Sequence, residues 1–214
     1  MVMRKLACFA ALLGLLAGFL GAPAPALAQD AAEDAGPDPT AATAGDAYVI
    51  GAADAPVTVI EYISLTCGFC ARFHLDTLPA LKTKYIDTGR LRMVVREYPL
   101  DGPGLQAAIL VRCLDEPRRD AFVQLLYERQ QSWVRGRDPL AQAKKLARLA
   151  GLGAERADAC LESDAIATAI LETRQAGERD HGVEGTPTFV IGGRSIQDAM
   201  TLEEFEEILL PLFN

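Results

Sequence analysis

The sequence predicts an α/β fold in which a strand-helix-strand unit and a later strand-strand-helix unit are separated by an all-helical insertion. Three observations lead to this prediction. Residues 57–96 contain two segments rich in β-branched residues with a helical segment between them. Residues 104–177 carry apolar residues at helical spacing, and strand-like composition returns at residue 186. The chain has 214 residues, 50% of them hydrophobic, which is enough for one substantial core.

Residues 1–28 have the pattern of a secretory signal peptide. Arg4 and Lys5 precede an apolar run, and Ala26-Leu27-Ala28 matches a small-x-small cleavage site. The alternative is an uncleaved membrane anchor, but the apolar run is short for a bilayer span of about 20 residues. We therefore expect cleavage after Ala28 and export of the mature chain.

The segment after the signal peptide, residues 29–46, is predicted to be a disordered acidic linker. It is rich in Ala, Asp, Gly, Pro and Thr and has no aromatic residue, so it cannot offset the entropy of ordering. The full chain has a net charge of -8, and removal of Arg4 and Lys5 leaves 19 minus 29, or -10. This acidity argues against nucleic-acid binding, because phosphate contacts require clustered Lys and Arg.

Local composition predicts the elements of the first half in turn. Residues 48–50 and 57–63 are predicted strands, the second one buried, and residues 91–96 form a third. A helix begins at Cys67 and is expected to kink or restart at Pro79. This helix supplies the crossover of a parallel strand pair, which is nearly always right-handed.

In the second half, Pro117 and Pro139 fit the first turns of helices, where a missing amide costs nothing. Gly192-Gly193 predicts a hairpin turn after the strand that begins near Thr186. Thr201 with a glutamate three residues later forms a capping box for the last helix. The predicted divisions are residues 1–28 for the signal peptide, 29–46 for the linker, 47–103 with 178–214 for the α/β domain, and 104–177 for the insertion.

Two cysteines stand where the strand at 57–63 gives way to a helix, in Cys67-Gly68-Phe69-Cys70. At positions i and i+3 of a first helical turn the two sulfurs face the same side and can close a disulfide reversibly. The positive end of the helix dipole lowers the pKa of the first thiol, and the thiolate is the attacking form. Cys67 is therefore predicted to be the nucleophile and Cys70 the resolving thiol.

A C-x-x-C pair is also half of a four-cysteine zinc site. A zinc site in this chain would have to recruit Cys113, Cys160 or a histidine from distant segments, because no second close pair exists. An exported protein also meets an oxidising compartment in which disulfides persist. The sequence therefore predicts redox chemistry with no metal and no organic cofactor.

The motifs as a set resemble the DsbA-like thioredoxin-fold oxidoreductases of the bacterial cell envelope. The resemblance rests on the C-x-x-C pair after a strand that carries a glutamate, on the helical insertion, and on the Gly-Thr-Pro-Thr stretch within residues 183–193. It covers roughly residues 46–213. It implies a thioredoxin fold, a periplasmic location, and a cis Pro187 that forms a substrate-binding surface with Thr186 and Phe69.

The resemblance also implies roles for residues outside the C-x-x-C pair. Glu61 stands where such proteins often carry a buried acid that relays the proton of the resolving thiol, although a solvated glutamate is the alternative. Cys113 and Cys160 match a structural disulfide, with two buried thiols or a pair that tunes the active site as alternatives. Such a disulfide would stabilise the fold by about 4 kcal/mol in the entropy model. Independently of the resemblance, His74 is expected to be a surface residue; the alternative, from its spacing of four residues after Cys70, is a place on the same helix face as the cysteines.

Three functions fit these residues. The first is a monomeric dithiol oxidase that donates its disulfide to reduced exported proteins and is reoxidised by a quinone-linked membrane oxidase. The second is an isomerase or reductase, which usually needs a dimerisation module that residues 29–46 do not obviously supply. The third is a redox-silent peptide-binding or chaperone-like protein. Gly68 and Phe69 replace the Pro and His of the most oxidising relatives, which predicts a weaker oxidant.

Overall fold

The computed structural model describes residues 48–213. The predicted signal peptide (1–28) and linker (29–46) lie outside the described residues. Within the described range, no helix has both the length and the apolar character that a bilayer crossing requires.

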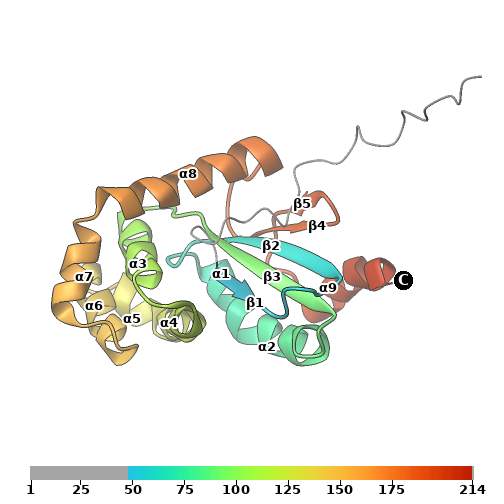
Figure 1. Ribbon diagram of the computed structural model, residues 1–214, viewed down its shortest axis with the longest axis horizontal. Coiled ribbons are helices and arrows are strands. Elements are labelled where there is room, and N and C mark those ends of the chain that lie inside the picture. The colour runs from blue at the N-terminus through green and yellow to red at the C-terminus, as the bar shows by residue number, and fades with distance from the viewer. Residues whose placement is uncertain (1–47, 214) are drawn as a thin grey trace, which may run out of the picture. The chain divides into compact units, whose positions relative to one another are not determined.

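A five-stranded mixed sheet lies at the centre of the described part of the chain (Figure 1). Its strands are β1 (Tyr48–Ile50), β2 (Val57–Ile63), β3 (Leu91–Glu97), β4 (Thr188–Ile191) and β5 (Arg194–Ile196). The order across the sheet is β1-β3-β2-β4-β5, with β2 and β3 parallel and the other pairs antiparallel. The α/β class and the parallel pair are as predicted. Because β2 is central and covered on both faces, Val59 and Ile60 are fully buried.

The helical segment between β2 and β3 changes its winding along its length. It consists of α1 (Gly68–Arg72), the wide π-type turn η1 (Phe73–Thr77), α2 (Leu78–Leu81) and a second π-type turn η2 (Lys82–Ile86). Pro79 lies in the first turn of α2, so the helix restarts where predicted, because proline cannot donate to the preceding turn. Single π-type turns of this kind are often found at functional sites.

Helices separate β3 from β4, as predicted. They are α3 (Gly102–Arg112), α4 (Glu116–Glu128), α5 (Gln130–Val134), α6 (Pro139–Leu149), α7 (Ala154–Leu161) and α8 (Asp164–His181). Figure 1 shows α3 to α7 grouped beside one end of the sheet, with α8 leading back towards β4. Helix α8 continues past Gly177, where a Cβ would lie 2.6 Å from the Tyr62 ring. Gly177 therefore serves close packing rather than helix termination.

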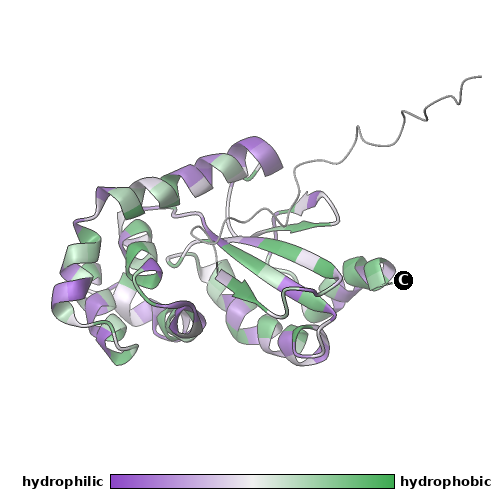
Figure 2. Ribbon diagram, viewed as in Figure 1, coloured by the Kyte–Doolittle hydropathy of each residue, from purple (hydrophilic) through white to green (hydrophobic). Residues whose placement is uncertain are grey.

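The last unit is a hairpin followed by a helix. Gly192 and Gly193 both have positive φ and form the predicted turn between β4 and β5. Thr201 and Glu204 make both hydrogen bonds of the capping box at the start of α9 (Leu202–Leu209), which leads into the turn η3 (Leu210–Phe213). Figure 2 shows hydrophobic residues along β2 and β3 and hydrophilic residues at the C-terminal end of α8.

Candidate active site

Cys67 is the N-cap residue of α1, the position that its place after β2 predicts. Its backbone is extended, and its carbonyl oxygen accepts the first helical hydrogen bond, from the Ala71 amide at 3.1 Å. The side chain is 8% exposed, so the sulfur lies at the rim of the core. The amides of Phe69 and Cys70, unsatisfied donors of the first helical turn, both contact this sulfur and stabilise its charged form.

These surroundings lower the pKa of the Cys67 thiol from 9.0 to about 5. The largest cause is a hydrogen bond from the Cys70 thiol, and smaller contributions come from the nearby Thr186 side chain and the two amides. Burial works in the opposite direction, because it disfavours the charged form. At neutral pH Cys67 is therefore a thiolate, the form that attacks disulfides.

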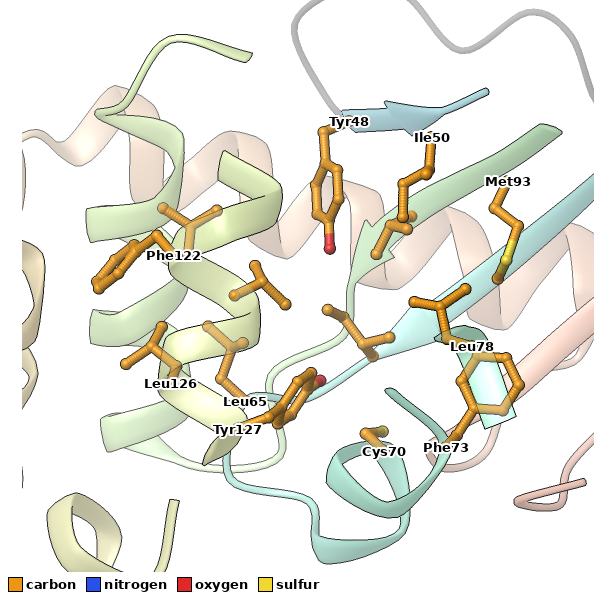
Figure 3. Close-up of a cluster of buried hydrophobic side chains, with 14 of the residues drawn as sticks. Tyr48, Ile50, Leu65, Cys70, Phe73, Leu78, Met93, Phe122, Leu126 and Tyr127 are labelled. Carbon is orange, nitrogen blue, oxygen red and sulfur yellow. The ribbon is translucent and has the colours of Figure 1, made fainter. Parts of the chain in front are cut away.

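The second cysteine, Cys70, has the opposite electrostatics. It is fully buried, and both it and Cys67 are free thiols in this structure. Burial raises the pKa of Cys70 well above its ordinary value, and the nearby charges of Cys67 and Glu61 raise it further. Figure 3 shows the Cys70 side chain beside the Tyr127 ring within the buried cluster. Two adjacent thiols whose pKa values are pushed apart suit one attacking and one resolving group.

A segment far along the chain lies next to Cys67. The Thr186-Pro187 peptide bond is cis, and the Cys67 sulfur lies 3.1 Å from the Thr186 carbonyl oxygen, to which it donates a hydrogen bond in its protonated form. The Thr186 hydroxyl is buried and has no hydrogen-bond partner among the described residues. Thr186 and Pro187 thus border the candidate nucleophile, which sequence separation alone could not establish.

Phe69 presents an apolar surface on the same helical turn. Its side chain is 57% exposed, and the Arg72 guanidinium lies 4.9 Å from the centre of its ring. An exposed aromatic residue beside a reactive sulfur gives a peptide an apolar contact area. The three residues assigned to substrate binding, Phe69, Thr186 and Pro187, therefore all lie close to Cys67 in the fold.

Glu61 is fully buried on β2, and its partner is His74 of η1. Nε2 of His74 is 3.1 Å from both carboxylate oxygens, and only 1% of the imidazole is exposed. The expectation that His74 is a surface residue is therefore wrong. The helix packs on the sheet through the face that carries Cys70, and His74, four residues later, shares that face. The Glu61 carboxylate gives the buried ring a hydrogen-bond partner, which offsets the cost of burying a polar group.

Two residues of the insertion hold the loop before Cys67, and sequence reasoning missed both. The side-chain amide of Gln130 is buried and donates to the carbonyl oxygens of Leu65 and Cys67 at 3.0 and 2.9 Å. The Tyr127 hydroxyl donates to the Ser64 carbonyl oxygen at 3.3 Å. No sequence signal identifies Gln130, because a glutamine on a helix is ordinarily solvent-exposed.

Cys113 and Cys160 are joined by a disulfide between the ends of α3 and α7, with Cα atoms 6.3 Å apart. Trp133 of the insertion is buried and donates from its indole nitrogen to the Leu126 carbonyl oxygen. Among residues 48–213, no three His, Cys, Asp or Glu side chains are arranged to hold a metal ion.

Comparison with known proteins identifies the family to which the chain belongs. Residues 43–210 match the family model described as thioredoxin. A Rickettsia typhi protein named as a protein-disulfide oxidoreductase is 33% identical over 148 residues, which are 68% of this chain and 54% of that protein. A Bacillus subtilis protein named disulfide bond formation protein D is 24% identical, over 75% of this chain and 74% of that protein. The chain spans about half the length of the Rickettsia relatives.

Solved structures agree with this assignment. The crystal structure of Wolbachia pipientis alpha-DsbA1 superposes with a TM-score of 0.73 and 27% sequence identity, covering 78% of this chain and 90% of that one. BdbD from Bacillus subtilis superposes with a TM-score of 0.71 at 21% identity, covering 79% of this chain and 93% of that one, and supports the fold alone. The chain therefore belongs to the thioredoxin family and has the fold of the DsbA-type disulfide oxidoreductases.

Proposed function

We propose that this protein is a periplasmic dithiol oxidase that donates a Cys67–Cys70 disulfide to reduced exported proteins. One observation carries the proposal: the low pKa of Cys67, about 5, beside the raised pKa of Cys70. A stabilised thiolate favours the reduced form of the pair, so the oxidised form readily gives its disulfide away. The names of the relatives point to the same class of chemistry.

Donation proceeds in two exchanges. A substrate thiolate attacks Sγ of Cys67, the Cys67–Cys70 bond breaks, and the electron pair passes to Cys70 while a mixed disulfide forms. A second thiolate of the substrate then attacks the substrate sulfur of that mixed disulfide, which closes the substrate disulfide and releases Cys67 as a thiolate. Two electrons pass from the substrate to the protein. Cys67 is a good leaving group because its thiolate is stabilised.

The substrate-binding surface in this proposal consists of Thr186, Pro187 and Phe69. An extended substrate chain would lie beside Thr186, next to the Cys67 sulfur, and place an apolar side chain on the exposed Phe69 ring. Glu61, buried within electrostatic reach of Cys70, is the proposed proton relay.

Turnover requires reoxidation of the dithiol. We infer a quinone-linked membrane oxidase as the electron acceptor and a cleaved signal peptide that delivers the chain to the periplasm. Gly68 and Phe69 offer no charge to the pair, so the oxidising power should lie below that of relatives with histidine in this position.

The decisive test compares two refolding reactions. The oxidised protein should accelerate disulfide formation in a fully reduced secreted protein far more than it rearranges a scrambled one. Faster rescue of the scrambled substrate would identify an isomerase instead. The Cys67→Ala variant should lose activity in both assays, and retained function in cells would mean that the chain binds peptides without redox turnover.

A further inference from the structure

The buried Glu61–His74 pair lies on the core side of the proposed resolving thiol. Glu61 comes from β2, His74 from η1 and Cys70 from α1, and none of the three is more than 1% exposed. Nε2 of His74 lies 3.1 Å from both carboxylate oxygens, and because an ionised carboxylate can only accept, Nε2 is the donor whenever Glu61 is ionised. The pair is thus hydrogen-bonded and shielded from solvent.

Aromatic rings enclose the pair. The Tyr127 ring of α4 lies 4.7 Å from the imidazole, and the Phe73 ring lies 5.7 Å from it. The Tyr127 hydroxyl is engaged by the Ser64 carbonyl oxygen. The described titratable groups that interact with Glu61 are Cys70 of the C-x-x-C pair, Tyr127 of α4 and Tyr48 of β1, and Cys67 acts in turn on Cys70 and Tyr127. Asp120 of α4 and Glu97 of β3 face this group from further away, through Tyr48.

Opening the disulfide creates a proton requirement in this pocket. When the Cys67–Cys70 bond breaks, Cys70 leaves with the electron pair as a fully buried thiolate, and burying an unpaired charge is costly. Cys67 cannot supply a proton, because its sulfur is then bonded to the substrate. The groups that surround Cys70 inside the core are placed to supply this proton.

We propose that His74 is a positioning residue that acts through Glu61, and that the two side chains form one proton-holding unit for Cys70. The inference rests on the proposed thiol-disulfide exchange. When the Cys67–Cys70 bond opens, the unit gives one proton to the Cys70 sulfur and changes from imidazolium-carboxylate to imidazole-carboxylate. When Cys70 attacks to close the disulfide, its proton returns to the unit.

Both members of the unit are required for this role. A carboxylate alone in the core would be an uncompensated charge, whereas the imidazole holds its oxygens by two contacts in a single orientation. The unit can therefore change by one proton while the Glu61 carboxylate keeps its hydrogen bonds from Nε2 of His74.

The test uses the full chain in its oxidised state, mixed with a reduced cysteine-containing peptide in a stopped-flow instrument. In the oxidised protein Cys67 has no proton to lose, so its titration does not contribute to the profile of exchange rate against pH. Each rate is divided by the thiolate fraction of the peptide, which removes the titration of the peptide itself. The profile should span about pH 5 to about pH 8, where imidazole changes charge. The matched variants are His74→Gln, which keeps an N–H donor that cannot titrate, and His181→Gln, which changes the other histidine of the described chain.

We expect His74→Gln to slow the reaction by roughly 10-fold near neutral pH and to flatten the profile, with Glu61→Gln slower by about 100-fold, the lower end for general acid-base catalysis. The ultraviolet titration of Cys67 in reduced His74→Gln should stay near pH 5. His181→Gln should follow the wild-type profile. His74→Ala is measured alongside, and His74→Gln carries the test if the alanine variant does not fold.

Three outcomes would overturn the inference: a wild-type profile for His74→Gln, an equal slowing at every pH, or a changed profile in His181→Gln. The first two would reduce His74 to a packing residue, the third would assign the pH dependence to the other histidine, and all three would leave the proposed function intact. Failure of the wild-type protein to oxidise the peptide would instead remove the proposed function itself.

Discussion

At the scale of single residues, the chemistry depends on two sulfurs three positions apart that experience opposite environments. Cys67 faces hydrogen-bond donors at a helix start, whereas Cys70 faces the core. The helix dipole and the free amides belong to the first turn only, so a cysteine one turn later receives little of this stabilisation. The difference between the two thiols therefore follows from where the helix begins.

The low pKa of Cys67 makes the stability of the reduced protein depend on pH. The folded-state pKa of about 5 lies below the ordinary value of 9.0, so the thiolate contributes stability that is complete above about pH 9 and is lost as the pH falls through 5. The oxidised protein lacks this titration. We expect the stability of the reduced form relative to the oxidised form to rise between these limits in urea unfolding. A flat difference would contradict the assigned thiolate.

The residue next to Cys70 should tune the oxidising power. Phe69→His places a group that can donate a hydrogen bond and carry charge beside the Cys67 thiolate, which stabilises the reduced pair. We expect the reduction potential to rise by about 30 mV, a tenfold change in the equilibrium constant for a two-electron couple, in equilibration with glutathione. Phe69→Leu is the control, because it stays apolar and should leave the potential near the wild-type value.

At the scale of elements, the start of α1 is held by segments that the chain reaches much later. The insertion contributes Gln130 of α5 and Tyr127 of α4, and the loop before β4 contributes Thr186. Each of these contacts a different atom of the 64–67 loop. The insertion is therefore part of the framework that presents Cys67.

Loss of the Gln130 side chain should weaken this framework. Gln130→Ala leaves the buried carbonyl oxygens of Leu65 and Cys67 without this donor, and one unsatisfied buried group costs about 1–3 kcal/mol. We expect the free energy of unfolding to fall by an amount in this range. Gln124→Ala on α4, whose amide donates to the exposed Glu128, should change it by less than about 0.5 kcal/mol. Equal effects of both substitutions would contradict the role given to Gln130.

At the scale of the whole described chain, the insertion and the sheet share one apolar core, and a buried ion pair links them. Arg112 of α3 donates to both carboxylate oxygens of Glu97 on β3 and to the Thr173 hydroxyl on α8, and both charged side chains are largely buried. Removing one partner of such a pair leaves an uncompensated charge in the core. The pair therefore fixes how α3 and α8 sit on β3.

The Cys113–Cys160 disulfide should stabilise the insertion without taking part in exchange. Replacing both cysteines with alanine removes the cross-link between α3 and α7, and we expect the free energy of unfolding to fall by about 3–4 kcal/mol, since the closed loop is long. The Cys67 titration should remain near pH 5. A shift of that titration would instead mean that the disulfide tunes the active site.

The sequence by itself determined the local features of this protein. The β-branched run of β2, the strand-to-helix position of Cys67, the restart at Pro79 and the capping box at Thr201 each depend on neighbours within a few residues. Backbone preferences and helix-end hydrogen bonds act over that distance, so a single sequence is enough to predict them.

Only the tertiary structure decided which distant groups meet. The four-residue spacing of Cys70 and His74 places them on one helix face but does not determine whether that face is buried. In the folded protein this face packs against the sheet, so His74 is buried beside Glu61. Gln130 reaches Cys67 only after the insertion has folded back over the 64–67 loop. In both cases a buried polar side chain has a partner that is distant in the sequence. Without that partner its burial would cost free energy, and only the folded chain determines whether the partner is there.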